Sequence, residues 1–236
     1  MRLVSNGGPK GVRTSLAEQL AALRGVDQKE LPKPLLDVAL RKVELAGGDI
    51  FLLRPADWEA LRHEEGGAGR PVPFWARPWP SGLALAAALD ADPPRPGARV
   101  LELGCGLGAP SIVAARAGAD VLATDGSTDA VAYAAHSLAL NGTEAEVAAA
   151  DWAEQSDALV ERGPFDLVIA ADVLYTRGNT ETALRMLPQL VAGWGRVVIA
   201  DPGRSNARDF LSAIRATFAL RTRRDGEVSL HELIPR

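Results

Sequence analysis

A glycine-rich segment near the middle of the chain has the composition of a ligand-binding turn. Residues 99–108 read Arg-Val-Leu-Glu-Leu-Gly-Cys-Gly-Leu-Gly, and the apolar residues before Gly104 indicate a buried strand. Pro110 suits the first turn of a helix, where its missing N–H leaves no hydrogen bond unmade. Gly104 and Gly106 allow a ligand to lie against the backbone, and the free N–H groups of the helix point to the same place. The segment predicts a loop that cradles a nucleotide-like ligand.

The details of this loop separate it from other glycine-rich turns. A P-loop ends in Lys followed by Ser or Thr, whereas Ala109 and Pro110 stand there. A dinucleotide fingerprint would place its third glycine at position 109, but the third glycine is Gly108, and Glu102 lies two residues before the first. A turn without a ligand is the plain alternative, and it is disfavoured because closely spaced glycines cost backbone entropy.

Two further acids follow predicted strands. Asp125 ends the strand predicted over residues 120–124, where a carboxylate can accept hydrogen bonds from ribose hydroxyls. Asp151 and Trp152 end the next strand, where the acid can bind the exocyclic amine of adenine and the indole can cover a ring face. The alternatives are that Asp125 only closes a turn and that Trp152 only packs in the core.

Two other segments have residue types that suit a ligand pocket. Residues 74–82 read Phe-Trp-Ala-Arg-Pro-Trp-Pro-Ser-Gly, and aromatic rings with a polar edge suit pocket walls. Trp75 and Trp79 can instead pack the N-terminal segment onto the sheet. Asp172 and Tyr175 follow a continuous apolar strand, and Asp172 is either a group that positions a substrate or a strand-end cap.

The composition limits the classes of function. The chain has 236 residues, of which 47% are hydrophobic, so it can bury one large core with an N-terminal appendage. A net charge of −4 disfavours nucleic acid as a partner. One cysteine and three dispersed histidines indicate no disulfide and no metal site. With no apolar leader and no span of membrane length, we expect a monomeric cytoplasmic protein without a membrane partner.

The periodicity predicts an N-terminal cap over residues 1–72 and a doubly wound α/β domain over residues 73–236. In the cap, helices are expected at 14–25, 34–46 and 57–63, with a strand at 50–53. In the α/β domain, strands are expected at 100–103, 120–124, 146–150, 165–171, 196–200, 218–223 and 227–234. Helices are expected at 82–90, 109–117, 129–140, 179–192 and 206–217.

Residues 74–236 are similar to the seven-strand class I S-adenosylmethionine-dependent methyltransferases. The segment from Glu102 to Gly108 looks like their first motif. Residues 73–82, 172–175 and 201–204 resemble segments of the branch that contains the electron-transfer-flavoprotein β-subunit lysine methyltransferases. The resemblance implies a Rossmann-like sheet of strand order 3-2-1-4-5-7-6 with the last strand antiparallel. It implies cofactor contacts at Trp79, Gly104, Cys105, Gly106, Asp125, Trp152 and Ala171, and a substrate amine near Asp172 and Tyr175.

The resemblance implies S-adenosylmethionine as cofactor and a protein lysine side chain as the methyl acceptor. A small amine or a heteroaromatic nitrogen is the alternative acceptor, and a binding module without catalysis is a third possibility. A nicotinamide oxidoreductase is disfavoured by Glu102 and by the glycine spacing. The mechanism needs no metal and no nucleophilic triad, because the sulfonium methyl group is already activated.

The loop spacing makes a prediction about ligand choice. We expect the protein to bind S-adenosylmethionine and not nicotinamide dinucleotides, because the glycine spacing departs from the dinucleotide fingerprint and the loop lacks the lysine of a P-loop. Calorimetric titration with both ligands measures this difference. Tight binding of NAD with no response to S-adenosylmethionine would overturn the interpretation of the loop.

Overall fold

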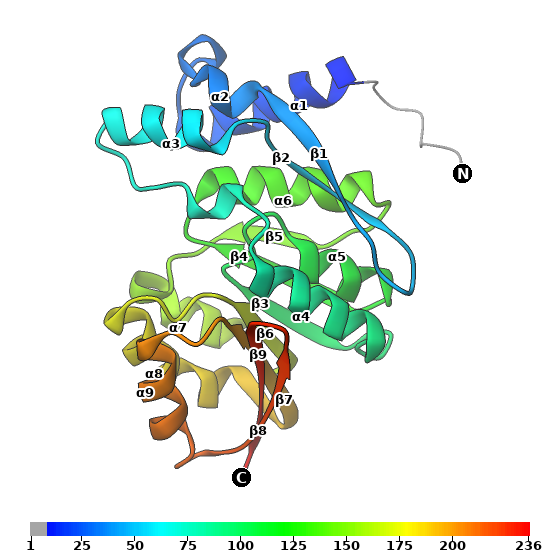
Figure 1. Ribbon diagram of the computed structural model, residues 1–236, viewed down its shortest axis with the longest axis vertical. Coiled ribbons are helices and arrows are strands. Elements are labelled where there is room, and N and C mark those ends of the chain that lie inside the picture. Colours follow the sequence, from blue (N-terminus) through cyan, green and yellow to red (C-terminus); the bar gives the residue numbers. More distant parts are fainter. Residues whose placement is uncertain (1–8) are drawn as a thin grey trace.

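A seven-stranded sheet forms the centre of the protein, for which a computed structural model describes residues 9–236 (Figure 1). Its strand order is β5-β4-β3-β6-β7-β9-β8. The first five strands in this order are parallel, and β9 runs antiparallel to both of its neighbours. The strands are β3 (Arg99–Leu103), β4 (Asp120–Asp125), β5 (Glu146–Ala149), β6 (Phe165–Ala171), β7 (Val191–Asp201), β8 (Phe218–Asp225) and β9 (Val228–Pro235). The predicted fold and strand order are confirmed.

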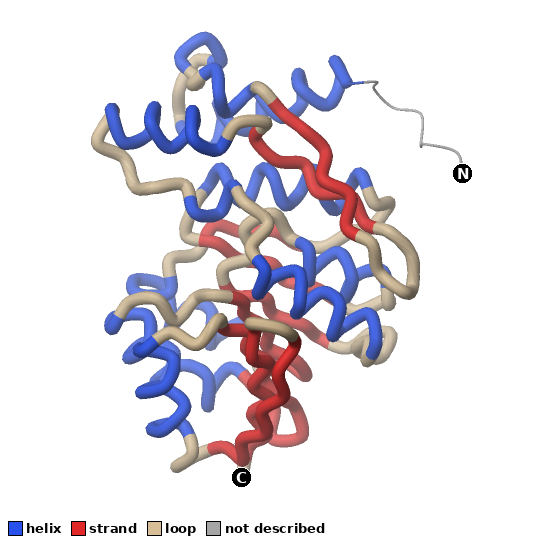
Figure 2. The backbone as a smooth tube through the Cα atoms, viewed as in Figure 1, coloured by secondary structure: helices blue, strands red, loops and turns tan. Residues whose placement is uncertain are grey.

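Helices cover both faces of this sheet. One face carries α4 (Pro80–Ala91), α5 (Ala109–Arg116) and α6 (Thr128–Leu140), and the other carries α7 (Trp152–Arg162), α8 (Arg177–Leu190) and α9 (Ser205–Ile214) (Figures 1 and 2). Each layer buries its own apolar cluster against the strands, which explains why β3 and β6 are apolar on both sides. The helix α7 has no counterpart among the predicted elements.

The N-terminal segment packs on α6 at the outer edge of the molecule (Figure 1). It contains α1 (Pro9–Arg24), η1 (Gln28–Glu30), α2 (Lys33–Leu36), β1 (Val38–Val43), β2 (Ile50–Pro55), α3 (Trp58–Gly67) and η2 (Phe74–Ala76). Leu16 and Leu20 of α1 are fully buried in the same cluster as Tyr133 of α6. The expectation of no apolar leader concerns residues 1–8, which lie outside the described residues.

The predicted helix over residues 34–46 is wrong. The helix α2 ends at Leu36, and residues 38–43 form β1, which pairs antiparallel with β2 from Val38↔Pro55 to Val43↔Ile50. The side chains of α6 hold β2 in place, since Asn141 and Ser137 bond to its backbone at 2.7 to 3.0 Å. The strand β1 therefore forms by pairing with β2, which α6, distant in sequence, holds in place, and this pairing overrides the local helical spacing.

A cluster of charged side chains joins three parts of this architecture. Arg24 at the end of α1 donates to both carboxylate oxygens of Asp129 on α6, with N to O distances of 2.8 and 2.5 Å. The same guanidinium contacts Glu65 of α3 at 3.2 Å, and Glu65 also bonds to Arg70. The side chains of Arg24, Asp129 and Glu65 are only 15%, 11% and 6% exposed. This charge cluster fixes α1 and α3 to α6.

We predict that Arg24→Ala lowers the free energy of unfolding by about 2–4 kcal/mol, because it leaves the largely buried carboxylate of Asp129 without its cation and takes one of two cations from Glu65. The matched control is Arg13→Ala, which breaks an exposed ion pair between α1 and Asp37. That variant should lose less than about 1 kcal/mol. Urea unfolding of both variants measures the difference, and equal losses would contradict a structural role for the cluster.

Candidate functional site

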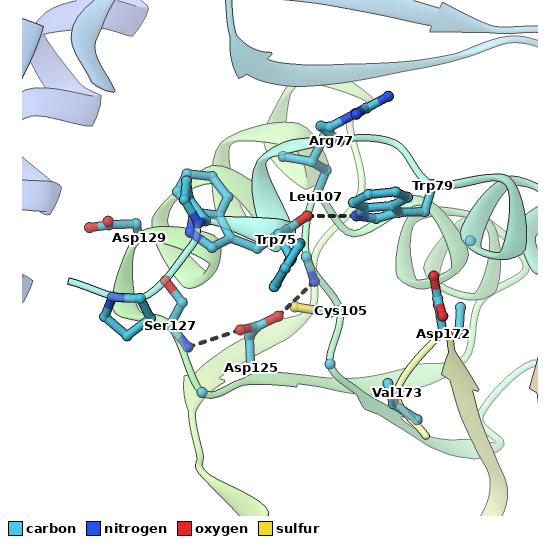
Figure 3. Close-up of a pocket in the computed structure, with 18 of the residues that line it drawn as sticks. Trp75, Arg77, Trp79, Cys105, Leu107, Asp125, Ser127, Asp129, Asp172 and Val173 are labelled. Atoms are coloured by element: carbon cyan, nitrogen blue, oxygen red, sulfur yellow. Dashed lines mark hydrogen bonds between the residues drawn. The ribbon is translucent and has the colours of Figure 1, made fainter. Parts of the chain in front are cut away.

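A cleft of about 930 Å³ opens at the carboxyl ends of the parallel strands. Its floor is the turn between β3 and α5, and its walls come from the N-terminal segment, the loop before α4 and the ends of β4 and β6 (Figure 3). All the residues predicted as site residues line it: Trp79, Glu102, Gly104, Cys105, Gly106, Asp125, Asp151, Trp152, Ala171, Asp172 and Tyr175. The structure thus brings them together, while their individual roles stay predictions.

The glycine turn requires glycine for two separate reasons. Gly104, Gly106 and Gly108 have φ values of 69°, 52° and 80°, which side chains rarely adopt. A Cβ atom at position 104 would also lie 2.8 Å from Val173 Cγ1, which is too close, whereas one at position 106 would make only an ordinary contact at 3.4 Å with the carbonyl oxygen of Trp75. The turn therefore keeps the backbone surface bare on the side that faces the cleft.

Glu102 stabilises the glycine turn through hydrogen bonds to the helix that follows it. It is 1% exposed, and its Oε2 accepts hydrogen bonds from the backbone N–H of Ser111, at 3.0 Å, and from the Ser111 hydroxyl. The Glu102 side chain therefore provides a hydrogen-bond acceptor for a backbone N–H in the first turn of α5, which has no partner within the helix. Burial raises the pKa of this carboxyl to about 8, although the Ser111 hydrogen bonds oppose the shift.

Asp125 links the ends of two strands. Its Oδ2 accepts from the N–H of Gly106 and its Oδ1 from the N–H of Ser127, both at 2.9 Å (Figure 3). Burial raises the pKa of this carboxyl, and the same two hydrogen bonds work against the rise. Asp125 thus closes the turn before α6, and each oxygen keeps a further lone pair for a ligand hydroxyl.

An aromatic wall covers the outer side of the cleft. The indole N–H of Trp79 donates to the carbonyl oxygen of Phe74 at 2.6 Å, and the Phe74 ring lies 6.3 Å from Trp79 and 6.4 Å from Tyr175. Phe74 and Tyr175 are 51% and 50% exposed. Trp75 instead packs on Tyr133 of α6, with ring centres 5.0 Å apart, so it serves packing as well as the wall.

The acids that follow β5 and β6 differ in their surroundings. Asp151 is exposed, and the next residue, Trp152, begins α7 and is buried in the apolar cluster under the cleft. Trp152 therefore both packs in the core and contributes to the lining. Asp172 is held by Arg204 at the start of α9, with Nε 2.5 Å from Oδ1.

Sequence reasoning missed several lining residues. Arg24, Glu65 and Asp129 reach the cleft through the charge cluster, and no local motif marks them. Arg77 lies over the rings of Trp58 and Trp79, 4.9 Å from each ring centre. Arg204 belongs to residues 201–204, which resemble a segment of the family named in the sequence analysis. Nothing in the spacing of these residues predicts that Arg204 contacts Asp172.

Within residues 9–236, no group of three or more His, Cys, Asp and Glu side chains is arranged to hold a metal ion. No helix in the same range has the length and apolarity to cross a membrane.

Residues 78–217, more than half of the chain, match the family described as lysine methyltransferase. The chain belongs to this family. It is 36% identical over 136 residues to the electron transfer flavoprotein β-subunit lysine methyltransferase of Xenopus laevis, covering 56% of this chain and 54% of the relative. It is 31% identical over 133 residues to EEF1A lysine methyltransferase 3 of Mus musculus, with 55% and 56% covered. The chain thus spans about half the length of these curated relatives.

Solved structures agree on the fold of this lysine methyltransferase family member. The 16S rRNA N2 G1207 methyltransferase of T. thermophilus aligns with a TM-score of 0.65 and 18% identity, covering 84% of this chain and 51% of that one. The ribosomal protein L11 methylase of Lactobacillus delbrueckii aligns with a TM-score of 0.56 and 22% identity, covering 68% and 81%. These similarities show the fold.

The buried carboxyl of Glu102 gives a prediction about stability and pH. Because its pKa is raised above that of the unfolded chain, the folded state holds the proton more tightly. The stabilisation that the protonated Glu102 carboxyl gives to the folded state is complete below the pKa of the unfolded chain and is lost as the pH rises through about 8. Glu102→Gln stays neutral at every pH. We therefore expect its free energy of unfolding, relative to that of the wild type, to increase by about 1–3 kcal/mol as the pH rises from about 5.5 to about 7.5.

Urea unfolding at several pH values tests this. The matched control is Glu227→Gln, since Glu227 is exposed next to the turn between β8 and β9 and should show no such divergence. A constant difference between Glu102→Gln and the wild type across this range would show that Glu102 is already ionised in the folded protein.

Proposed function

We propose that the protein is an S-adenosylmethionine-dependent methyltransferase that transfers a methyl group to the side-chain nitrogen of a protein lysine. The observation that carries the proposal is the convergence of the glycine turn, Asp125 and Asp172 on one cleft. Membership of the lysine methyltransferase family supports it. So do the names of the relatives, which are enzymes for the electron transfer flavoprotein β subunit and for EEF1A.

The residues of the cleft fit this cofactor. Gly104 and Gly106 line the cleft without side chains, which suits close approach of a methionine moiety to the backbone. Asp125 has free lone pairs at the end of β4, where ribose hydroxyls would be received. Trp152 and Asp151 lie beside it, on the adenine side.

When bound, S-adenosylmethionine supplies an activated methyl group on a positively charged sulfur. The chain then has to hold the acceptor nitrogen in line with that methyl group and exclude water from it. Asp172 lies apart from Asp125 in the cleft (Figure 3), and Asp172 and Tyr175 suit the acceptor side. The rings of Trp79 and Phe74 line the same side of the cleft, close to Tyr175.

The outer wall favours a protein side chain as acceptor over a small molecule. Phe74 and Tyr175 are half exposed, so the acceptor side is open to a chain that arrives from outside. The net charge of −4 disfavours nucleic acid. A monomeric state, a cytoplasmic location and a boundary between residues 72 and 73 stay predictions.

The proposal predicts that labelled methyl groups pass from S-adenosylmethionine to a protein. The purified protein is incubated with the labelled cofactor and either the electron transfer flavoprotein β subunit, EEF1A or a mixture of small amines, and the products are separated by mass. Label in lysine of either protein supports the proposal. Label only in small amines would favour the alternative acceptor, and no transfer to any acceptor despite cofactor binding would favour a binding module.

Two variants show whether the cleft performs this transfer. Asp172→Asn should lower transfer by about 100-fold while leaving cofactor affinity nearly intact, because it disturbs only the acceptor side. Full activity of a folded Asp172→Asn protein would remove Asp172 from the site.

Asp125→Ala should weaken cofactor binding by about 1–3 kcal/mol, because the ribose hydroxyls of the cofactor lose their charged hydrogen-bond partner.

A further inference from the structure

Asp172 has a backbone conformation imposed by its surroundings. Its φ is 57°, and no other non-glycine residue between 9 and 236 has a positive φ. Its N–H donates to the carbonyl oxygen of Ala200 at 2.8 Å, so pairing with the end of β7 fixes this geometry. Strain of this kind persists only where the structure enforces it, and it gathers at functional sites.

Arg204 holds the carboxylate of Asp172 in one orientation. Its Nε lies 2.5 Å from Oδ1 of Asp172, whose side chain is only 12% exposed. Within residues 9–236, no group donates a hydrogen bond to Oδ2 of Asp172. The ion pair therefore leaves one oxygen for a ligand in the cleft.

Arg204 is itself placed by a buried acid. Oδ1 of Asp201, at the end of β7, accepts from the N–H of Gly203 at 2.6 Å and from the N–H of Arg204 at 2.8 Å. Asp201 is 1% exposed, so the turn is anchored in the protein interior. The guanidinium thus reaches Asp172 from a fixed turn. The Asp172 carboxylate raises the pKa of Arg204, which stays a cation.

We propose that Arg204 is a positioning residue that balances the charge of Asp172, so that the acceptor amine is bound in its neutral, nucleophilic form. This inference rests on the proposed function. A carboxylate alone stabilises an ammonium, which has no lone pair and cannot attack. An Asp172–Arg204 pair carries no net charge, so it can accept a hydrogen bond from an amine without favouring the ammonium.

The bond changes of the transfer show where this matters. The lysine ammonium first loses a proton to water, and the lone pair of the neutral amine then forms the bond to the methyl carbon. The bond between sulfur and that carbon breaks, its electron pair stays on sulfur, and the positive charge passes to the methylated nitrogen. The first of these events depends on the local charge, which Arg204 sets.

Other ionisable side chains line the same cleft, and they are left unchanged in the variants of the experiment described below. Tyr175 belongs to the loop after β6, and Arg77 precedes α4. Asp201 at the end of β7 does not line the cleft, but it is buried beneath the turn that carries Arg204. The remaining ionisable side chains of the lining are Arg24, Glu65, Arg70, Glu102, Cys105, Asp125, Asp129 and Asp151.

Sinefungin provides a probe that needs no acceptor and no turnover. It is an analogue of S-adenosylmethionine with an amine-bearing carbon in place of the methylated sulfur, so its ammonium would lie beside Asp172. S-adenosylhomocysteine lacks that amine and serves as the reference ligand. The measured quantity is the ratio of the two dissociation constants, Kd of S-adenosylhomocysteine over Kd of sinefungin, obtained by calorimetry for each variant.

We expect Arg204→Gln to raise this ratio by about 3- to 10-fold near neutral pH, because the ammonium then meets an unbalanced carboxylate in a partly exposed site. The increase should shrink toward about pH 10, where the amine loses its proton. Arg204→Lys should keep the ratio within about 2-fold of the wild type, since it keeps the charge. Arg208→Gln, an exposed arginine one turn along α9, is the matched control and should change nothing.

Melting temperatures accompany the binding data, and Arg204→Met replaces the Gln variant if the latter is unfolded. An unchanged ratio in a folded Arg204→Gln or Arg204→Met protein would overturn the inference and leave the proposed function intact. A ratio that rises equally in Arg208→Gln would also overturn it, because the effect would then be one of general charge. Failure of the wild type to bind either ligand would overturn the proposed function together with the inference.

Discussion

The structure depends on a turn in which three of five successive residues are glycines with left-handed backbones. Gly104, Gly106 and Gly108 all have left-handed backbones, which stabilises no packing and costs entropy on folding. Neighbouring carboxylates offset this cost. Glu102 binds the first turn of α5 through Ser111, and Asp125 accepts from the N–H of Gly106. The cleft exists because a buried acid, Glu102, and a half-buried one, Asp125, hold the backbone in a shape that it would not adopt alone.

The sequence predicted this part of the molecule well because its signals are local. Apolar runs bounded by glycine marked β3, β4 and β6, and the spacing of acids after the strands marked the rim of the sheet. The bounds of β6 agree with the prediction to the residue. The position of Asp125 at the end of β4 also follows from spacing, although its bond to Gly106 does not.

Features made by distant partners could not be predicted in this way. The strand β1 exists because β2 pairs with it and because Asn141 of α6 holds β2, so the local pattern at residues 38–43 is misleading. The charge cluster joins Arg24 to Asp129, which lies 105 positions along the chain. Its residues look like ordinary surface charges in the sequence, and only the packing of α1 against α6 buries them.

The same limit applies to the acceptor side, where the chemistry is decided by a pair and not by one residue. The sequence singles out Asp172 as a lone carboxylate, which would attract and keep an ammonium. The structure adds Arg204 from the start of α9, 32 positions away, at a distance that balances this charge. A carboxylate so paired remains a good hydrogen-bond acceptor while it loses most of its preference for cations. Under the proposal that Asp172 receives the acceptor lysine, the step from binding that lysine to preparing it for attack therefore lies in the contact between the residues after β6 and before α9, which no motif in either segment shows.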